Sequence, residues 1–211
     1  MKRKGALVVI SGFSGAGKGT IVKALLQKYD NYALSVSMTT RSPRPGEQDG
    51  REYFFVTDER FEQEIANGGL LEHAGYVGHY YGTPRRYVEE QMAAGKDVIL
   101  EIEVQGAGQI RRLYPEAVLL FVTTPSAQIL HERLTGRGTE DAETIRSRLR
   151  QAAEREAPLI PDYDYLIVND ELDESVARVH EVIQAAHTAP ARCRAFIGEF
   201  ADELRRLAEE S

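Results

Sequence analysis

Apolar residues along this chain fall into short continuous runs, separated by stretches that have the period of a helix. Four runs cover residues 7–10, 98–102, 118–122 and 166–168. They show little alternation with polar residues, which is typical of parallel strands that helices cover on both faces. The pattern therefore predicts an α/β fold with a doubly wound parallel sheet.

Two segments interrupt this rhythm. Residues 35–88 combine prolines, glycines and aromatic residues without a strand-helix repeat, and residues 135–150 are rich in Gly and Arg and lead into a charged helix. We interpret both as mobile insertions into a core of residues 1–34, 89–134 and 151–189. A chain of 211 residues is long enough for one such domain and short for two.

The last predicted element is a helix within residues 190–211. Ile197, Phe200, Leu204 and Leu207 recur at steps of three and four residues and form one apolar face. Such a face more often packs on its own chain than on a partner. The sequence leaves open whether the protein is a monomer or a homo-oligomer.

Residues 12–20 read G-F-S-G-A-G-K-G-T and lie between a predicted strand and a predicted helix. Glycines let the backbone turn several N–H groups toward one point. The helix start and the charge of Lys18 favour an anion at the same place. This order of elements predicts a P-loop NTPase-type fold. The residues expected to hold nucleotide phosphates are Gly12, Phe13, Ser14, Gly15, Ala16, Gly17, Lys18, Gly19 and Thr20.

The loop departs from the strict pattern at one position. Ser or Thr usually follows the lysine directly, whereas here Gly19 follows Lys18 and the hydroxyl comes at Thr20. We expect Thr20 to lie near a Mg²⁺ ion that accompanies the nucleotide, either in direct contact or through a water molecule.

Composition narrows the class of protein. The chain is 42% hydrophobic and 28% charged, with a formal net charge of −7, which argues against the broad basic face of a nucleic-acid-binding protein. Its one cysteine, Cys193, excludes an internal disulfide and suits a reducing cytoplasm. No apolar stretch reaches the length of a membrane span. The composition therefore predicts a cytoplasmic enzyme with small-molecule substrates.

Arg41 and Arg44 stand three residues apart in a proline-containing loop. A guanidinium group is well suited to the oxygens of a phosphate. A solvated loop without a ligand would explain this pair equally well.

Several motifs occur together in one order, and with them the chain resembles the guanylate kinase family from about residue 6 to about residue 187. They are the phosphate loop, S-x-T-T-R-x-P-R-x-G-E from Ser37, G-x-x-Y-x-F from Gly50, L-L-E-H-A from Leu70, Y-Y-G-T from Tyr80, E-I-E-V-Q-G-A from Glu101, R-L-x-G-R-G from Arg133 and I-V-N-D from Ile167. The resemblance implies Mg²⁺-dependent transfer of the γ-phosphoryl group of ATP to GMP, and also to dGMP. It makes residues 35–88 a GMP-binding insertion and residues 135–150 a short lid.

The resemblance also implies how GMP is held. The residues that match the family's GMP phosphate ligands are Arg41, Arg44, Tyr53 and Tyr81. Glu72 would accept hydrogen bonds from guanine N1 and N2, and Ser37 and Thr83 would address O6. This fits the chemistry of the base, because guanine presents two adjacent donors where adenine presents a bare acceptor at N1.

Glu101 and Glu103 follow a predicted strand, at the edge where ligands bind in open α/β sheets. The family more often has Asp at both positions. By resemblance, Glu101 would lie near the metal and the phosphates, and Glu103 near the guanine amino group. We favour the contact of Glu103 with guanine over the contact of Glu101 with Mg²⁺.

By resemblance, the lid supplies three arginines that surround the transferred group, namely Arg133, Arg137 and Arg148. With Lys18 and Arg41 they form the predicted catalytic set. Positioning and charge stabilisation carry most of the catalysis of phosphoryl transfer, so the sequence needs no His or Cys nucleophile. Asn169 would contact the adenine of ATP.

Two alternatives are a kinase for another nucleoside monophosphate and a non-catalytic interaction module with a guanylate-kinase-like fold. Ser37, Glu72 and Thr83 argue against the first alternative, and the intact Lys18 argues against the second. A regulatory GTPase is disfavoured because no N-K-x-D motif occurs in the chain.

Overall fold

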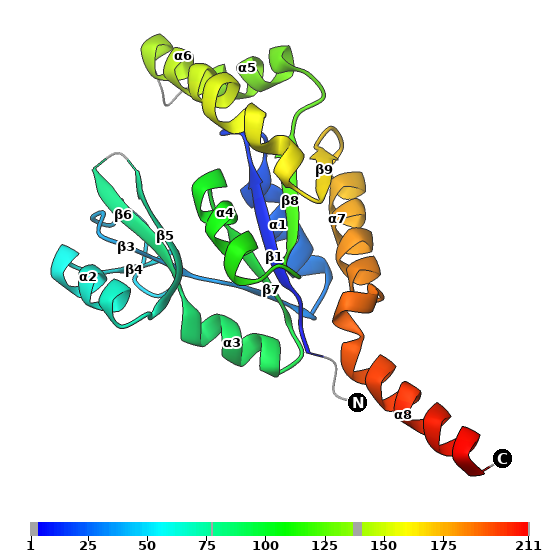
Figure 1. The fold of residues 1–211 in the computed structure, drawn as a ribbon. Coiled ribbons are helices and arrows are strands. Elements are labelled where there is room, and N and C mark those ends of the chain that lie inside the picture. Colours follow the sequence, from blue (N-terminus) through cyan, green and yellow to red (C-terminus); the bar gives the residue numbers. More distant parts are fainter. Residues whose placement is uncertain (1–3, 77, 137–140, 211) are drawn as a thin grey trace.

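The computed structural model describes residues 4–76, 78–136 and 141–210, and within these ranges the chain forms a central parallel sheet of five strands (Figure 1). The strand order is β2 (Tyr32–Leu34), β7 (Asp97–Glu101), β1 (Leu7–Gly12), β8 (Val118–Thr123) and β9 (Tyr165–Val168). All four apolar runs found in the sequence are strands of this sheet. The edge strand β2 has three residues, too few for a pattern.

Helices cover both faces of the central sheet. Val8 and Ile10 of β1 pack in one apolar core with α1 (Lys18–Lys28) and α7 (Leu172–Ala186). Leu7 and Val9 pack in a second core with α3 (Arg85–Ala93) and α4 (Val104–Leu113). Successive strand residues point to opposite faces, so a strand covered on both sides is apolar throughout. The predicted α/β fold of the P-loop NTPase type is confirmed.

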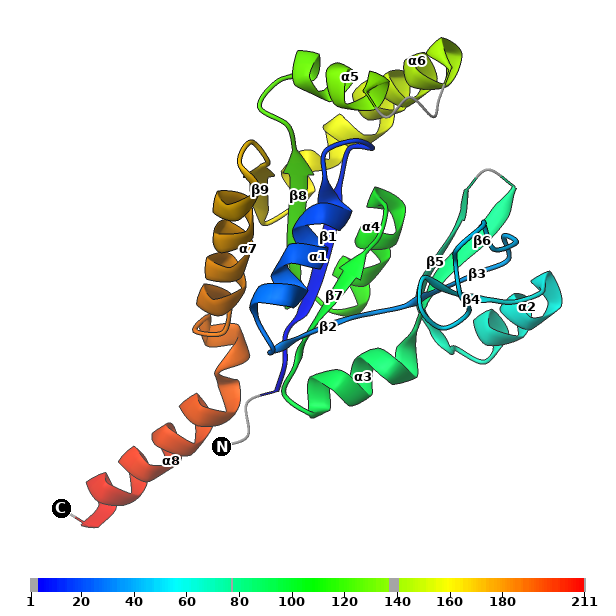
Figure 2. The ribbon, with the colours of Figure 1, turned by 180° about the vertical axis from the view of Figure 1, so that it is seen from behind.

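A second sheet stands beside the first (Figure 2). Its strand order is β4 (Tyr53–Phe55), β3 (Ser37–Thr39), β6 (His79–Pro84) and β5 (Leu70–Tyr76). The helix α2 (Asp58–Ala66) packs on it through Phe61, which is fully buried and stacks on the ring of Tyr80 with centroids 5.4 Å apart. The aromatic residues of segment 35–88 therefore form part of a small sheet-and-helix unit.

A helical segment lies over the carboxyl ends of β1 and β8 (Figure 1). It consists of α5 (Ala127–Thr135), α6 (Ala142–Gln151), the π-helical turn η1 (Ala152–Glu156) and the 3₁₀ turn η2 (Ala157–Asp162). Leu130, Leu134 and Ile145 form a small core that also contacts Phe13 of the phosphate loop. Movement of this segment relative to the central sheet stays a prediction.

The chain ends in the 3₁₀ turn η3 (Pro190–Arg192) and the helix α8 (Arg194–Glu210), which points away from the rest of the molecule (Figures 1 and 2). None of the residues of α8 is buried. The apolar face of this helix therefore does not pack on its own chain. Packing on the own chain is the more frequent outcome for such a face, so the structure departs here from the sequence-based expectation. No described helix is both long and apolar enough to cross a membrane.

Candidate active site

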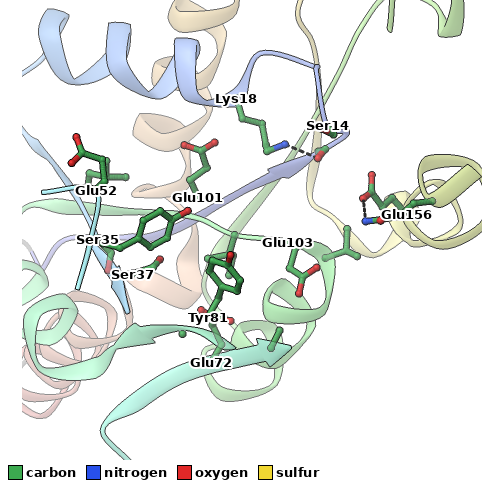
Figure 3. Close-up of a pocket in the computed structure, with 18 of the residues that line it drawn as sticks. Ser14, Lys18, Ser35, Ser37, Glu52, Glu72, Tyr81, Glu101, Glu103 and Glu156 are labelled. Carbon is green, nitrogen blue, oxygen red and sulfur yellow. Dashed lines mark hydrogen bonds between the residues drawn. The ribbon is translucent and has the colours of Figure 1, made fainter. Parts of the chain in front are cut away.

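A cleft of about 450 Å³ opens between the carboxyl edge of the central sheet, the second sheet and the α6–η1 segment (Figure 3). It collects many of the residues that the sequence indicates, although these are far apart along the chain. The predicted residues in its wall are Gly12, Ser14, Lys18, Ser37, Tyr53, Glu72, Tyr81, Glu101, Glu103 and Arg148. The other described residues of the predicted site lie outside this wall, namely Phe13, Gly15, Ala16, Gly17, Gly19, Thr20, Arg41, Arg44, Thr83, Arg133 and Asn169. Arg137 lies outside the described residues.

The phosphate loop keeps the conformation that its glycines permit. Gly15 and Gly17 have φ angles of 89° and 93°, a region that other residues rarely adopt. A Cβ atom at Gly17 would lie 2.4 Å from Nδ2 of Asn169. That amide is buried and donates to the carbonyl of Ala16 over 2.7 Å. Asn169 therefore holds the loop in place, and its predicted contact with adenine stays a prediction.

Lys18 begins α1 and folds back over the loop. Its Nζ donates to the carbonyl oxygens of Gly12 at 2.7 Å and Phe13 at 3.1 Å. Phe13 packs edge-to-face on Phe121 with ring centroids 5.0 Å apart. The ammonium group thus lies at the cleft wall, next to the positive end of the α1 dipole.

Glu101 projects from the end of β7 toward the first turn of α1, on the same side of the cleft as Lys18 (Figure 3). A Cβ atom at Gly19 would lie 3.6 Å from its Oε1. The walls of the cleft displace water and raise the pKa of the Glu101 carboxyl, an effect that the charge of Lys18 partly offsets. Thr20, whose side chain is exposed, lies in the same first turn of α1 and carries a second side-chain oxygen there.

Glu72 is a buried carboxylate on the opposite side, in β5, with an exposed fraction of 4%. The hydroxyl of Thr83 donates to its Oε1 over 2.6 Å. A Cβ atom at Gly106 would lie 2.5 Å from Oε2, so only glycine leaves room for the carboxylate there. Burial raises the pKa of Glu72 to about 7, and the charge of Glu103 acts in the same direction. Among the described residues, the hydroxyl of Thr83 is the one hydrogen-bond donor to this carboxylate, which is fewer than a buried anion needs.

We expect Glu72→Gln to stabilise the folded protein above pH 7. The pKa of Glu72 is about 7 in the folded protein, whereas an exposed carboxyl of this kind has a pKa of 4.5. Between these two values the folded state binds the extra proton, so the free energy of unfolding falls as the pH rises through that window. The penalty reaches at most about 3 kcal/mol. Glutamine carries no charge and can still accept from Thr83. Urea unfolding at pH 5 and pH 8 measures the effect, with the exposed Glu62→Gln as control. An equal pH dependence in wild type and Glu72→Gln would contradict it.

Arg41 is held rigidly beside the cleft. Both of its terminal nitrogens lie 3.0 Å from carboxylate oxygens of Glu47, and its guanidinium lies 5.3 Å from the centre of the Tyr53 ring. The hydrogen bond with Glu47 raises the pKa of Arg41 further above its already high value. Tyr53 and Tyr81 meet edge-to-face with centroids 5.9 Å apart. The backbone N–H of Arg44 also donates to Glu47, whereas its side chain is exposed.

Two further carboxylates, Glu103 and Glu156, lie in the wall of the cleft. Within the described residues, Oε1 of Glu103 and Oε2 of Glu156 are buried and have no hydrogen-bond partner. Burial raises the pKa of both groups, and the charge of Glu156 adds to the effect on Glu103. Gln151 donates to the other oxygen of Glu156 over 2.9 Å. Sequence reasoning missed Glu156, because nothing in a charged helical stretch shows which acid the π-helical turn η1 directs inward.

The α6–η1 segment contacts the phosphate loop directly. Nη1 of Arg148 donates to the hydroxyl of Ser14 over 2.7 Å. Arg133 lies in the last turn of α5 and is partly exposed. The cleft thus has a cationic end with Lys18 and Arg148, a second cationic corner at Arg41, and an acidic wall at Glu72 and Glu103. It can bind a molecule that carries phosphates at one end and hydrogen-bond donors at the other.

Comparison with known proteins identifies the family. A family model described as guanylate kinase matches residues 4–186. The guanylate kinase of Latilactobacillus sakei subsp. sakei (strain 23K) is 50% identical over 188 residues, which are 89% of this chain and 92% of that protein. The guanylate kinase of Streptococcus thermophilus (strain CNRZ 1066) is 48% identical over 213 residues and both chains are covered completely. The crystal structure of guanylate kinase from Anaplasma phagocytophilum superposes with a TM-score of 0.74 at 33% identity, covering 91% of each chain. The chain therefore belongs to the guanylate kinase family.

Proposed function

We propose that this protein transfers the γ-phosphoryl group of ATP to GMP and forms ADP and GDP in a reversible, Mg²⁺-dependent reaction. The observation that carries the proposal is the buried carboxylate of Glu72 in the same cleft as the phosphate loop. Guanine offers N1–H and N2–H on one edge, so it can supply the donors that Glu72 lacks. Adenine would place the lone pair of N1 against a carboxylate. The reaction would take place in the cytoplasm, where both nucleotides are found.

The other predicted GMP ligands fit this orientation. The phosphate of GMP would lie near Arg41, Tyr53 and Tyr81, with Arg44 reaching in from its exposed loop. The single proton of the Thr83 hydroxyl is donated to Glu72. Thr83 would therefore orient Glu72, and Ser37 is the better candidate for the contact with O6. Glu103, whose Oε1 is buried, would accept from the guanine amino group.

The donor would bind at the opposite end of the cleft. Its phosphates would lie on the loop N–H groups and Lys18, with Arg148 of α6 beside them. Oxygen ligands are those that Mg²⁺ prefers, and Thr20 and Glu101 provide them near the start of α1. A bound Mg²⁺ would neutralise charge on the β- and γ-phosphates. The phosphate of GMP is itself the nucleophile, so the site needs no general base.

The proposal is tested by following the reaction with phosphorus NMR. A mixture of ATP, Mg²⁺ and GMP should lose the γ-phosphate signal of ATP and gain the β-phosphate signals of ADP and GDP in equal amounts. Removal of Mg²⁺ with EDTA should stop the change, and ATP alone should be consumed far more slowly. Consumption of ATP at one rate with and without GMP would overturn the proposal.

The affinity for GMP should fall as the pH drops below 7. Two guanine donors favour the ionised form of Glu72, whose pKa in the ligand-free protein is about 7, so binding must expel the proton that Glu72 carries in acid. Between pH 7.5 and pH 6 we expect the dissociation constant to rise about tenfold more in wild type than in Glu72→Gln. The phosphate of GMP also titrates in this pH range, but its effect is the same for wild type and for Glu72→Gln, so it cancels in the comparison. Calorimetric titrations at the two pH values measure the difference, and parallel pH profiles would show that Glu72 does not bind as a carboxylate.

A further inference from the structure

The helix α8 presents an exposed apolar face. Phe196, Ile197, Phe200, Leu204 and Leu207 have exposed fractions between 46% and 60%. The rings of Phe196 and Phe200 stack on each other with centroids 6.0 Å apart. Contiguous apolar patches of this kind mark interaction sites on a protein surface. We propose that α8 is a dimerisation helix, whose apolar face packs against α8 of a second copy of this chain in antiparallel orientation.

The segment that leads into α8 is fixed to the body of the protein. Nε2 of His187 lies 2.7 Å from Oδ1 of Asp97, and both side chains are buried. Arg192, two residues before the helix, donates to the carbonyl oxygens of Glu116 at 2.9 Å and Gly5 at 3.3 Å. From this fixed segment the helix extends away from the body (Figures 1 and 2), so its apolar face does not pack on its own chain.

The spacing of the apolar residues suits a pair of helices. Ile197 and Leu204 occupy one set of positions seven residues apart, and Phe200 and Leu207 occupy the other, as in the a and d positions of a heptad. In an antiparallel pair, Ile197 lies opposite Leu207 of the second copy and Phe200 lies opposite Leu204, so all four layers are apolar. The small residues Ala201 and Ala208 flank the contact and allow the two helices to approach closely.

The area agrees with what a dimer needs. A fully buried Phe removes about 150–250 Å² from water. Five large side chains that are each about half exposed therefore offer roughly 500 Å² per copy, or about 1,000 Å² for the pair. Stable interfaces bury about 1,200–2,000 Å², and the flanking side chains of α8 supply the remainder. The antiparallel arrangement also keeps the two bodies at opposite ends of a helix of 17 residues, about 25 Å long.

The polar face argues against a membrane as the occupant. Helices that lie in a membrane surface usually carry Lys and Arg on this face, because cell membranes are anionic. In α8, five acidic residues outnumber three basic ones; they are Glu199, Asp202, Glu203, Glu209 and Glu210 against Arg194, Arg205 and Arg206. In a pair of α8 helices this polar face stays in water, where its charges are solvated and screened.

The proposal is tested by measuring the mass of the protein in solution with light scattering. Wild type at about 50 μM should have the mass of two chains of 23.6 kDa each. The double variant Phe200→Gln with Leu204→Gln should have the mass of one chain, with unchanged circular dichroism. The matched control, Glu199→Gln with Asp202→Gln, changes the polar face of the same helix and should remain a dimer. Both variants should keep wild-type phosphotransfer, since α8 is remote from the cleft.

Three outcomes would overturn the proposal. A wild type that stays at one chain mass up to several hundred μM has no dimer. A dimer that survives Phe200→Gln with Leu204→Gln uses another surface. If wild type is a monomer, and the double variant but not the control melts at a lower temperature, the helix packs on its own body. Co-sedimentation of wild type with phosphatidylserine vesicles, lost in the double variant, would assign the face to a membrane.

Discussion

Replacing Lys18 with alanine should lower kcat by about a thousandfold or more and leave the protein folded. The ammonium group lies at the cleft wall, where it donates to the carbonyl oxygens of Gly12 and Phe13, so truncation removes a charge and little packing. Groups that stabilise the transferring phosphoryl are worth about 10³–10⁵ in kcat. Steady-state rates and thermal unfolding of the variant measure the two effects separately.

The matched control for this variant is Lys23→Ala. Lys23 lies on the same helix α1 and its side chain is exposed, so its removal changes the same net charge without touching the cleft. It should keep wild-type turnover. A folded Lys18→Ala protein that turns over as fast as Lys23→Ala would show that Lys18 does not stabilise the transferred phosphoryl group.

The second large effect concerns base selection. In Glu72→Gln, an NH₂ group can replace one acceptor oxygen and face a guanine donor. A charge-assisted hydrogen bond contributes roughly 1.5–3 kcal/mol, so kcat/KM for GMP should fall by about ten- to a few-hundredfold. The new NH₂ can donate to adenine N1, so turnover of AMP should stay level or rise. The ratio of kcat/KM for GMP to that for AMP is the quantity to measure.

This ratio separates base recognition from a general defect. Loss of folded protein would lower both rates together and leave the ratio unchanged. Glu62→Gln, on the exposed surface of α2, provides a variant of identical chemistry outside the cleft. An unchanged ratio in folded Glu72→Gln would show that Glu72 does not read the base.

The central sheet could be predicted because its strands are buried on both faces. Burial on both sides leaves the continuous apolar runs at residues 7–10 and 118–122. The second sheet could not be predicted in the same way. Its strands β3 and β4 have three residues each, too few to show an alternation of apolar and polar residues. They pair residues 37–39 with residues 53–55, and no local sequence pattern indicates this pairing. The sequence therefore indicates an insertion at residues 35–88 but not the sheet that it forms.

The site shows a similar division. Lys18 stands in a loop whose chemistry is readable from residue type and spacing, whereas the roles of Arg41 and Glu72 follow from the resemblance to the guanylate kinase family. The hydrogen bonds that position them are not readable, because they join residues distant in the chain. Asn169 supports the carbonyl of Ala16, and Glu47 holds Arg41 on both terminal nitrogens. Such partners depend on the packing of separate elements and become visible only in three dimensions.

The most direct test of the account compares acceptors in one assay of ADP formation at saturating Mg²⁺ and ATP. GMP, dGMP, AMP, CMP and UMP differ in the edge they present to Glu72, while all five carry the same phosphate. Two charge-assisted bonds to guanine predict a kcat/KM for GMP at least about a hundredfold above those for AMP, CMP and UMP, with dGMP close to GMP. Equal use of AMP or of a pyrimidine nucleotide would contradict the account.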